Sequence, residues 1–266
     1  MGDICYEPLL QDMTWSFSRL NTYRDCPQQW YLHYLMDEPE HERFYSSFGS
    51  FCHELIARYY TGDLAKEELL PEFLCGFSNR VLGERPSEKI ERRYLDQGAD
   101  YFAHFEPFPY ETLLVEQPVD FSVCGLKFTG VIDWLGRDRD GSLVLIDHKS
   151  ADLKPYSGRG KPTKDDFRLH ETMRQLYLYC VWVKESFGEY PKLLILNCFR
   201  TGKQIGEIFS PASLEEAKRW ALATYQKILG DSAFLPTDEY YYCRYICSQH
   251  ENCELYQEEY GRGRGK

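Results

Sequence analysis

The chain has 266 residues, of which 43% are hydrophobic and 27% are charged. A chain of this length can bury about 70–75% of the surface that its unfolded form exposes, so its core needs no disulfide framework. The composition excludes a disordered or collagen-like protein, and no apolar run is long enough for a membrane span. The first 15 residues lack the layout of a signal peptide, so we expect a cytoplasmic protein.

The charge balance is acidic, with 31 basic against 42 acidic residues and a net charge of −11. This balance argues against a protein whose whole surface attracts nucleic acid, although it allows a local basic groove. Aromatic residues reach 16%. Such rings fill cores and also stack on bases, and composition alone does not distinguish the two uses.

Helical signals fill the first 109 residues. Ser16 can cap a short helix, and Pro27 suits the first position of a second helix that continues to Tyr34. Gly62 can close a helix, and Asp63 can cap the next one. The pattern therefore predicts further helices over 48–60, 63–81 and 87–105.

Strand signals begin at Tyr110. Runs rich in Val, Ile, Leu and Phe, with turns at Cys124-Gly125 and Asp140-Gly141, predict strands joined by short hairpins. A long helix over 165–187, strands over 192–199 and 203–209, and a helix over 213–229 follow. We predict one α/β domain over 1–266, with a helical part (1–109), a mixed-sheet core flanked by helices (110–230) and a Cys-rich tail (231–266).

The most specific chemistry lies in GVIDWLGRDRDGSLVLIDHKS, residues 130–150. Asp147 and Lys149 are two residues apart on a predicted strand, so their side chains point from the same face. A turn at Asp140-Gly141 places Asp133 opposite residues 147–149 to within one position. Both acids interrupt apolar runs, where an unpaired charge is costly to bury.

Two such carboxylates suit magnesium or manganese, which prefer oxygen ligands. A metal held there can activate water and stabilise charge on a phosphate, and Lys149 can support the transition state. The spacing alone fits an Asp–Lys pair beside an unrelated hairpin aspartate equally well.

The segments GVIDWL and IDHKS resemble the core of the PD-(D/E)XK nuclease superfamily, and are most similar to RecB-like exonucleases and CRISPR-associated adaptation nucleases. SFSRLNTYRDCPQQWYLHYL resembles the N-terminal signature of that group. FGSFCHELI resembles its Gly-x-x-x-His element, with Gly49 and His53, and QLYLY its Gln-x-x-x-Tyr element, with Gln175 and Tyr179. The matches run in order to the cysteines near the C-terminus.

The resemblance implies a restriction-endonuclease-like fold and a metal-dependent DNA nuclease, with exonuclease action on single strands. It makes Asp133 and Asp147 ligands of the catalytic Mg or Mn, and Lys149 the catalytic lysine. It also implies that His53 is a further ligand and that the residues of the Gln-x-x-x-Tyr element, Gln175 and Tyr179, support the site. The residues alone leave simple packing open for His53 and for that element, and Glu116 is a lower-ranked acid.

Cys243, Cys247 and Cys253 form a C-x3-C-x5-C pattern of the kind that zinc or iron–sulfur ligation requires, and Cys26 is the natural fourth ligand. The resemblance implies a 4Fe–4S cluster that joins the two ends of the chain. The family spacing is C-x2-C-x5-C, so structural zinc and an empty site remain alternatives. The other cysteines are expected to be core filler: Cys5, Cys52, Cys75, Cys124, Cys180 and Cys198.

Between Lys149 and Arg168 the chain has six basic and three acidic residues. The segment SADLKPYSGRGKPTK is expected to form a loop beside the site that binds single-stranded DNA or free ends, with contacts from Lys154, Arg159, Lys161 and Lys164. A solvated loop is the alternative, and GRGRGK adds charge at the C-terminus. Two other functions remain open: a catalytically silent DNA-binding or scaffold subunit, and a protein-interaction module. Expected partners are recombination, repair or CRISPR-adaptation proteins.

Overall fold

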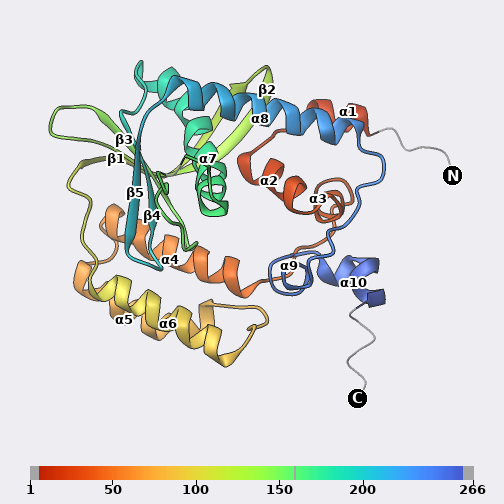
Figure 1. Cartoon of the computed structure of the whole chain (residues 1–266). Helices are drawn as coiled ribbons and strands as arrows, with labels where there is room; N and C mark the ends of the chain where they lie inside the picture. Colours follow the sequence, from red (N-terminus) through yellow and green to blue (C-terminus); the bar gives the residue numbers. More distant parts are fainter. Residues whose placement is uncertain (1–5, 159, 260–266) are drawn as a thin grey trace.

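The computed structural model describes residues 6–158 and 160–259. Its centre is a five-stranded sheet in the order β1-β2-β3-β4-β5 (Figure 1). The strands are β1 (Glu111–Val123), β2 (Leu126–Arg137), β3 (Leu143–His148), β4 (Leu193–Cys198) and β5 (Lys203–Ile208). Neighbours pair antiparallel except β3 and β4, which are parallel. The predicted α/β core, a mixed sheet flanked by helices, is confirmed.

Helices surround the sheet on several sides. They are α1 (Glu7–Asp12), α2 (Phe17–Asp25), α3 (Pro27–Tyr34), α4 (Phe44–Thr61), α5 (Lys66–Arg80), α6 (Glu88–Ala103), α7 (Lys164–Phe187), α8 (Pro211–Gly230), α9 (Tyr240–Tyr245) and α10 (Glu254–Glu259). In Figure 1, α4, α5 and α6 lie below the sheet and α8 crosses above it. Helix α7 forms the crossover between the parallel strands β3 and β4. Among the described residues, no helix has the length and apolar character needed to cross a membrane.

Most predicted helix ends agree with the structure. The Ser16 side chain accepts a hydrogen bond from the Arg19 amide, and Gly62 closes α4 with a φ of 83°. Two expectations were wrong. Helix α4 begins at Phe44 rather than Phe48, because both phenylalanines are fully buried and belong to one apolar face.

The second error concerns the start of α5. Its N-cap is Ala65, whose amide donates to the Glu68 carboxylate, whereas the Asp63 carboxylate accepts from Thr61. The Cys-rich tail contains α9, a 3₁₀ turn (His250–Asn252) and α10. Helix α8 begins two residues before the predicted position, with Ser210 as its cap.

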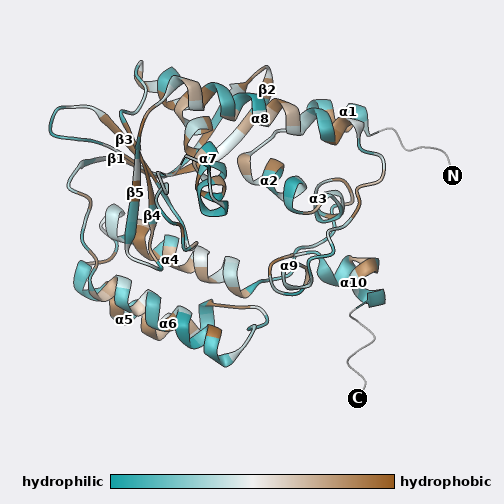
Figure 2. Ribbon diagram, viewed as in Figure 1, coloured by the Kyte–Doolittle hydropathy of each residue, from teal (hydrophilic) through white to brown (hydrophobic). Residues whose placement is uncertain are grey.

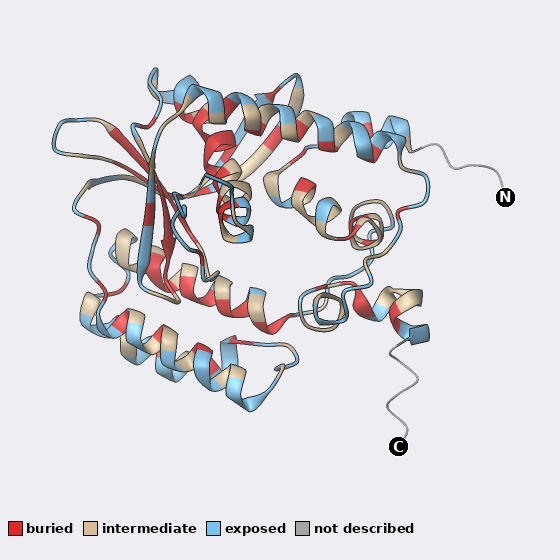
Figure 3. Ribbon diagram, viewed as in Figure 1, coloured by how far each residue is buried: buried red, intermediate tan, exposed pale blue. Residues whose placement is uncertain are grey.

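Both faces of the sheet are covered, as the hydrophobic strands in Figure 2 and the buried strands in Figure 3 show. One face packs against α7 and α8 through residues such as Leu145 and Leu196. The other face packs Trp134 and Ile146 against Phe108. All six residues of β3 are therefore buried, which explains its nearly continuous apolar sequence.

Helices α4, α5 and α6 form a second aromatic core. Phe48 and Phe199 join this core to the end of β4. This attachment positions α4 so that its His53 lies beside the end of β3, where the His53 Nε2 is 3.0 Å from the His148 carbonyl oxygen.

Candidate active site

Asp133 and Asp147 lie across from each other on β2 and β3. Trp134 pairs with Ile146, so the register expected from the turn places the two acids directly opposite. Ile132 and Leu135 both belong to the core beneath α7, whereas Trp134 packs on the other face. The two-residue alternation of β2 is therefore interrupted at Asp133. Both acids are buried, with Asp133 8% and Asp147 2% exposed.

The Asp133 carboxylate is held at the end of β3. Its Oδ2 accepts a hydrogen bond of 2.6 Å from the His148 amide. Burial, and then the negative charge of Asp147, raise the pKa of Asp133 to about 7. Two neighbouring carboxylates that are both buried favour a bound proton or a bound cation over two free charges.

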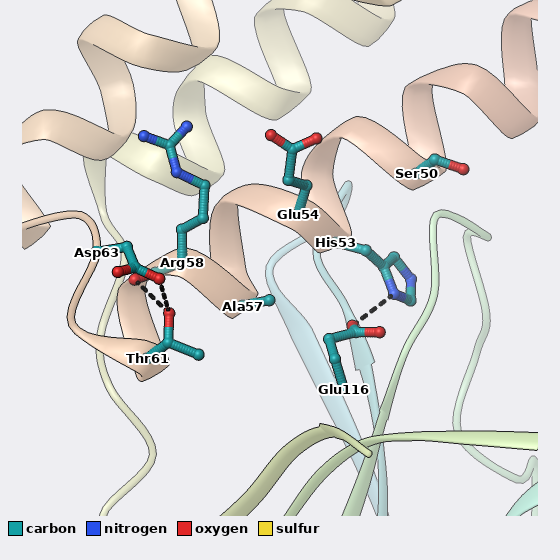
Figure 4. A pocket seen from close by; sticks show the side chains of 9 residues that line it. Ser50, His53, Glu54, Ala57, Arg58, Thr61, Asp63 and Glu116 are labelled. Atoms are coloured by element: carbon teal, nitrogen blue, oxygen red, sulfur yellow. Dashed lines mark hydrogen bonds and ion pairs between the residues drawn. The ribbon is translucent and has the colours of Figure 1, made fainter. Parts of the chain in front are cut away.

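His53 of α4 faces these acids. Its Nδ1 lies 3.6 Å from Asp133 Oδ2 and 3.8 Å from Glu116 Oε1, and Figure 4 shows the ring turned towards Glu116. The Nε2 donates to the His148 carbonyl, because a carbonyl can only accept. Nδ1 is therefore the nitrogen left for a cation or a second proton. Burial alone would lower the pKa of His53, but the hydrogen bond to Glu116 and the charge of Asp133 outweigh it and raise the pKa.

Glu116 completes a set of three potential metal ligands. One ligand atom each from His53, Glu116 and Asp133 lies within 4.8 Å of the others. Register pairs on both sides, Val115 with Trp134 and Gln117 with Ile132, place Glu116 opposite Asp133 on β1. Its φ of 46° is unfavourable for a residue with a side chain, and such strain is concentrated at functional sites.

Glu116, the lower-ranked acid, lies closer to His53 and Asp133 than the sequence indicates. The sequence shows only that the Glu116 carboxylate interrupts the apolar run LLVEQPV. No sequence pattern indicates the strained backbone that directs Glu116 towards His53. Asp147, which was predicted as a metal ligand, is not part of the three-residue set. Its Oδ2 instead lies 2.7 Å from the Lys149 ammonium.

Lys149 is held by a chain of polar contacts from α7. Its Nζ donates to Gln175 Oε1 at 2.7 Å, and Gln175 Nε2 donates to the Tyr179 hydroxyl at 3.1 Å. Gln175 and Tyr179 are four residues apart, so they share a helix face. The Tyr179 ring lies directly against Gly130, where an added Cβ would be 2.5 Å from the ring. The structure thus brings the predicted lysine, glutamine and tyrosine together.

His148 lies between Asp147 and Lys149 in the sequence, but its side chain is buried in the protein. Its Nδ1 is 2.9 Å from the Asn197 amide nitrogen, which also donates to the Tyr101 hydroxyl. Complete burial holds the pKa of His148 well below its usual range, so the ring is neutral. The backbone carbonyl of Asn197 also accepts a hydrogen bond from the Lys149 amide. These buried contacts fix the end of β3, and sequence analysis did not find them.

The four predicted cluster cysteines line one small cavity: Cys26, Cys243, Cys247 and Cys253. Burial and the neighbouring thiols raise the pKa of Cys243 to about 11 and that of Cys247 to about 12. The tail is fixed to the N-terminal part by Tyr242, which donates to Gln29, and by Arg43, which donates to the Cys247 carbonyl.

The remaining cysteines behave differently from one another. Cys52, Cys180 and Cys198 are buried as expected, but Cys75 and Cys124 are exposed. Cys124 lies in the predicted turn between β1 and β2 with a φ of 51°, and this turn leaves its side chain exposed rather than in the core. Cys5 lies outside the described residues.

The basic loop after β3 is partly neutralised. Lys154 lies 2.8 Å from the Asp165 carboxylate, while Lys161 and Lys164 are exposed. Asp166 accepts hydrogen bonds from Ser157 and Thr163, which fold the loop back onto the start of α7. Arg159 and the GRGRGK segment lie outside the described residues.

The chain is similar to known proteins both in sequence profile and in fold. A profile of the PD-(D/E)XK nuclease superfamily matches residues 14–254, and the chain belongs to this superfamily. A crystal structure named "Putative exonuclease" from Eubacterium rectale is 12% identical, with a TM-score of 0.53, and the match covers 97% of this chain and 91% of that chain. This likeness supports the nuclease-like fold.

A second solved structure, SSO0001, is 17% identical with a TM-score of 0.35, over 92% of this chain and 87% of that chain. No curated protein matches the sequence.

Proposed function

We propose that the chain is a single-domain, metal-dependent DNA nuclease of the RecB-like type that hydrolyses phosphodiester bonds, acting as an exonuclease on single-stranded DNA. The observation that carries the proposal is the convergence of two buried aspartates with Lys149 at the end of β3, beside His53. Members of the superfamily usually use divalent metal ions, and the residues present suit one.

The donor set fits magnesium or manganese. Asp133, Glu116 and His53 offer two carboxylate oxygens and one imidazole nitrogen within 4.8 Å of one another. The Asp147 Oδ2 is buried beside the Lys149 ammonium, and the charge of Asp147 destabilises the charged form of Asp133. A cation would relieve that cost. When bound, it supplies water of lowered pKa and positive charge beside the phosphate.

The residues of the chain perform the remaining tasks. The Asp147 carboxylate lies 2.7 Å from the Lys149 ammonium, and Gln175 orients that ammonium by accepting a hydrogen bond from it. With one proton directed to Gln175 and one to Asp147, the third ammonium proton is left to donate to a phosphate oxygen, where negative charge develops during hydrolysis. Tyr179 fixes Gln175 and is itself fixed against Gly130.

We further propose a 4Fe–4S cluster held by Cys26, Cys243, Cys247 and Cys253. A zinc–sulfur distance of about 2.3 Å in a tetrahedron requires sulfur atoms about 3.8 Å apart. Among the described residues, these cysteines form no group of three ligand atoms within 4.8 Å of one another. A cluster keeps its thiolates farther apart than a single ion does, so the wider spacing favours iron–sulfur over zinc. Its role is structural, because the tail joins α3 there.

A cleavage assay tests the proposed function. Linear and circular single-stranded DNA are incubated with the chain in Mg²⁺, in Mn²⁺ or in EDTA. We expect metal-dependent loss of the linear strand from an end, while the circular strand survives. Binding without cleavage in either metal would instead identify the silent DNA-binding subunit. The visible spectrum and iron content after anaerobic purification test the cluster, and one zinc per chain in colourless protein would contradict it.

The His53 assignment has its own test. We expect His53→Ala to move half-maximal cleavage to a higher manganese concentration, because one ligand is lost while the carboxylates remain. An unchanged manganese titration would show that His53 only packs. We also propose that DNA contacts come from the loop lysines Lys154, Lys161 and Lys164, with Arg159 beside them, in a cytoplasmic protein that works with recombination, repair or CRISPR-adaptation proteins.

A further inference from the structure

His250 lies between the cysteine cavity and a buried arginine. Its side chain is 5% exposed and lines the same cavity as the four cysteines of the proposed cluster. It also lines a second, polar cavity together with Arg43, and its Nε2 lies 3.3 Å from Arg43 Nη2. Figure 1 shows this region, where α9 lies beside α3 and the start of α4.

The contact with Arg43 determines which nitrogen of His250 carries the proton. A guanidinium group can only donate hydrogen bonds, so Nε2 must accept, and the proton of the neutral ring is on Nδ1. This Nδ1 is buried, and it has no hydrogen-bond partner among the residues that the structure describes. Because a buried N–H without an acceptor is costly, the ring is suited to donate to a group in the cysteine cavity.

The same contact argues against His250 as a metal ligand. A neutral imidazole that ligates through Nδ1 carries its proton on Nε2, where it normally donates to a carbonyl, a carboxylate or water. Here that proton would be directed at another donor, the Arg43 guanidinium. The Glu251 carboxylate, at 3.9 Å from Nε2, is too distant for a hydrogen bond. His250 therefore fits a donor to sulfur better than it fits a ligand.

Two of the four cysteine sulfurs already accept N–H groups. The Gln29 amide lies 3.4 Å from Cys26 Sγ, and the Gln249 amide lies 3.4 Å from Cys247 Sγ. Such donors favour a thiolate over a thiol, and hydrogen bonds to sulfur help to set the reduction potential of an iron–sulfur cluster. A hydrogen bond from His250 would add a side-chain donor to these two amides.

Arg43 supplies a buried positive charge to the same region. Its side chain is 4% exposed, and its Nε donates to the Cys247 carbonyl at 2.7 Å. Two acids that line its cavity contact other basic groups, Glu84 with Arg244 and Glu251 with His41. Across residues 6–158 and 160–259, no carboxylate lies within ion-pair distance of this guanidinium. A buried cation is costly without a counter-charge, and a centre held by four thiolates is an anion that would provide one.

We propose that His250 Nδ1 donates a hydrogen bond to a sulfur of the centre held by Cys26, Cys243, Cys247 and Cys253, and that Arg43 fixes the ring and adds positive charge. The inference rests on the proposed 4Fe–4S cluster. A hydrogen bond strengthens as its acceptor becomes more negative, so the pair stabilises the reduced cluster more than the oxidised one. His250 and Arg43 thereby set the reduction potential of the cluster.

A redox titration of the anaerobically purified full chain, followed by visible absorption and electron paramagnetic resonance, tests this role. His250→Leu removes the donor and keeps a side chain of similar size. We expect the wild-type iron content, with a ratio of reduced to oxidised cluster about tenfold lower at the wild-type midpoint. For a one-electron couple, this tenfold change is a midpoint about 59 mV more negative. His250→Asn keeps an N–H near the position of Nδ1 and should keep the wild-type midpoint.

His41→Leu is the matched control. The His41 ring lies 6.3 Å from the His250 ring between centroids but does not line the cysteine cavity, so this variant should keep the wild-type midpoint. An unchanged midpoint in His250→Leu would overturn the proposal alone, as would an equal shift in His250→Asn or His41→Leu. Loss of iron from both His250 variants would make His250 a ligand and also overturn it. A wild type without iron would overturn the proposed cluster together with this inference.

Discussion

Gly130→Ala tests whether the packing of Tyr179 controls the position of Lys149. An alanine Cβ at this position would lie 2.5 Å from Tyr179 Cε1 and 2.8 Å from its hydroxyl oxygen. Favourable carbon contacts are about 3.5–4.0 Å, so the ring must move by about 1 Å. Tyr179 is only 6% exposed and cannot move into solvent.

The expected cost has two parts. Overpacking of a buried site destabilises by about 1–3 kcal/mol, which corresponds to a loss of about 2–12 °C in Tm for a domain of this size. The displaced hydroxyl also withdraws its support from Gln175, which accepts a hydrogen bond from Lys149. A displacement of about 1 Å in a catalytic group can reduce the rate by about 100-fold.

The assay combines thermal unfolding with the initial rate of single-strand cleavage in Mn²⁺, measured well below the melting temperature. Gly206→Ala is the matched control, because an added Cβ on β5 meets nothing closer than 3.4 Å, from Leu193 Cδ1. We expect this control to keep the wild-type rate. A Gly130→Ala protein that cleaves as fast as the Gly206→Ala protein would refute the proposed link between the ring and the lysine.

Three other outcomes are expected. Asp133→Ala, Asp147→Ala and Lys149→Ala should each abolish cleavage without unfolding the chain by circular dichroism, and combined losses should not add because the groups act as a unit; full activity of Asp133→Ala would exclude its role. The pKa of Asp133 is about 7 in the folded protein and 3.8 in the reference state. Protonation of Asp133 therefore stabilises the metal-free protein below pH 4, and this contribution is lost as the pH rises to 7. Manganese binding should strengthen over the same interval, because the metal competes with the proton. The melting temperature of the wild type should therefore fall more between pH 4 and 7 than that of Asp133→Asn. An equal fall in the two proteins would contradict that pKa. Cys26→Ser should yield colourless protein of low stability, whereas the exposed Cys75→Ser should keep any cluster spectrum.

Local signals predicted most of the secondary structure. The hairpin turn at Asp140-Gly141 placed Asp133 opposite residues 147–149 to within one position, and the structure pairs this stretch so that Asp133 faces Asp147, because antiparallel register is determined by the turn. Helix starts were recovered where a side chain caps the helix, as at Ser16. They were missed where burial decides, as at Phe44, or where the capping side chain lies inside the helix, as Glu68 does for Ala65.

The candidate site was only partly predictable for a related reason. Asp147 and Lys149 follow from a two-residue spacing on one strand, which the sequence displays directly. The placement of Glu116 depends on a strained backbone in β1, and the approach of His53 to Asp133 depends on how α4 packs beside the end of β3. Such contacts join residues that are far apart in the chain, and no local pattern records them.

The attachment of the tail to α3 also has a consequence during synthesis. Gln29 and Tyr242, which are hydrogen-bonded, are 213 residues apart, so at about 5–20 residues per second the first waits about 10–40 s for the second. Until then the surface around Trp30, which later stacks on Phe234, stays uncovered. A polypeptide released before residue 234 never covers it. Such fragments would present an apolar surface to chaperones and proteases, so that the full-length chain is the form that persists.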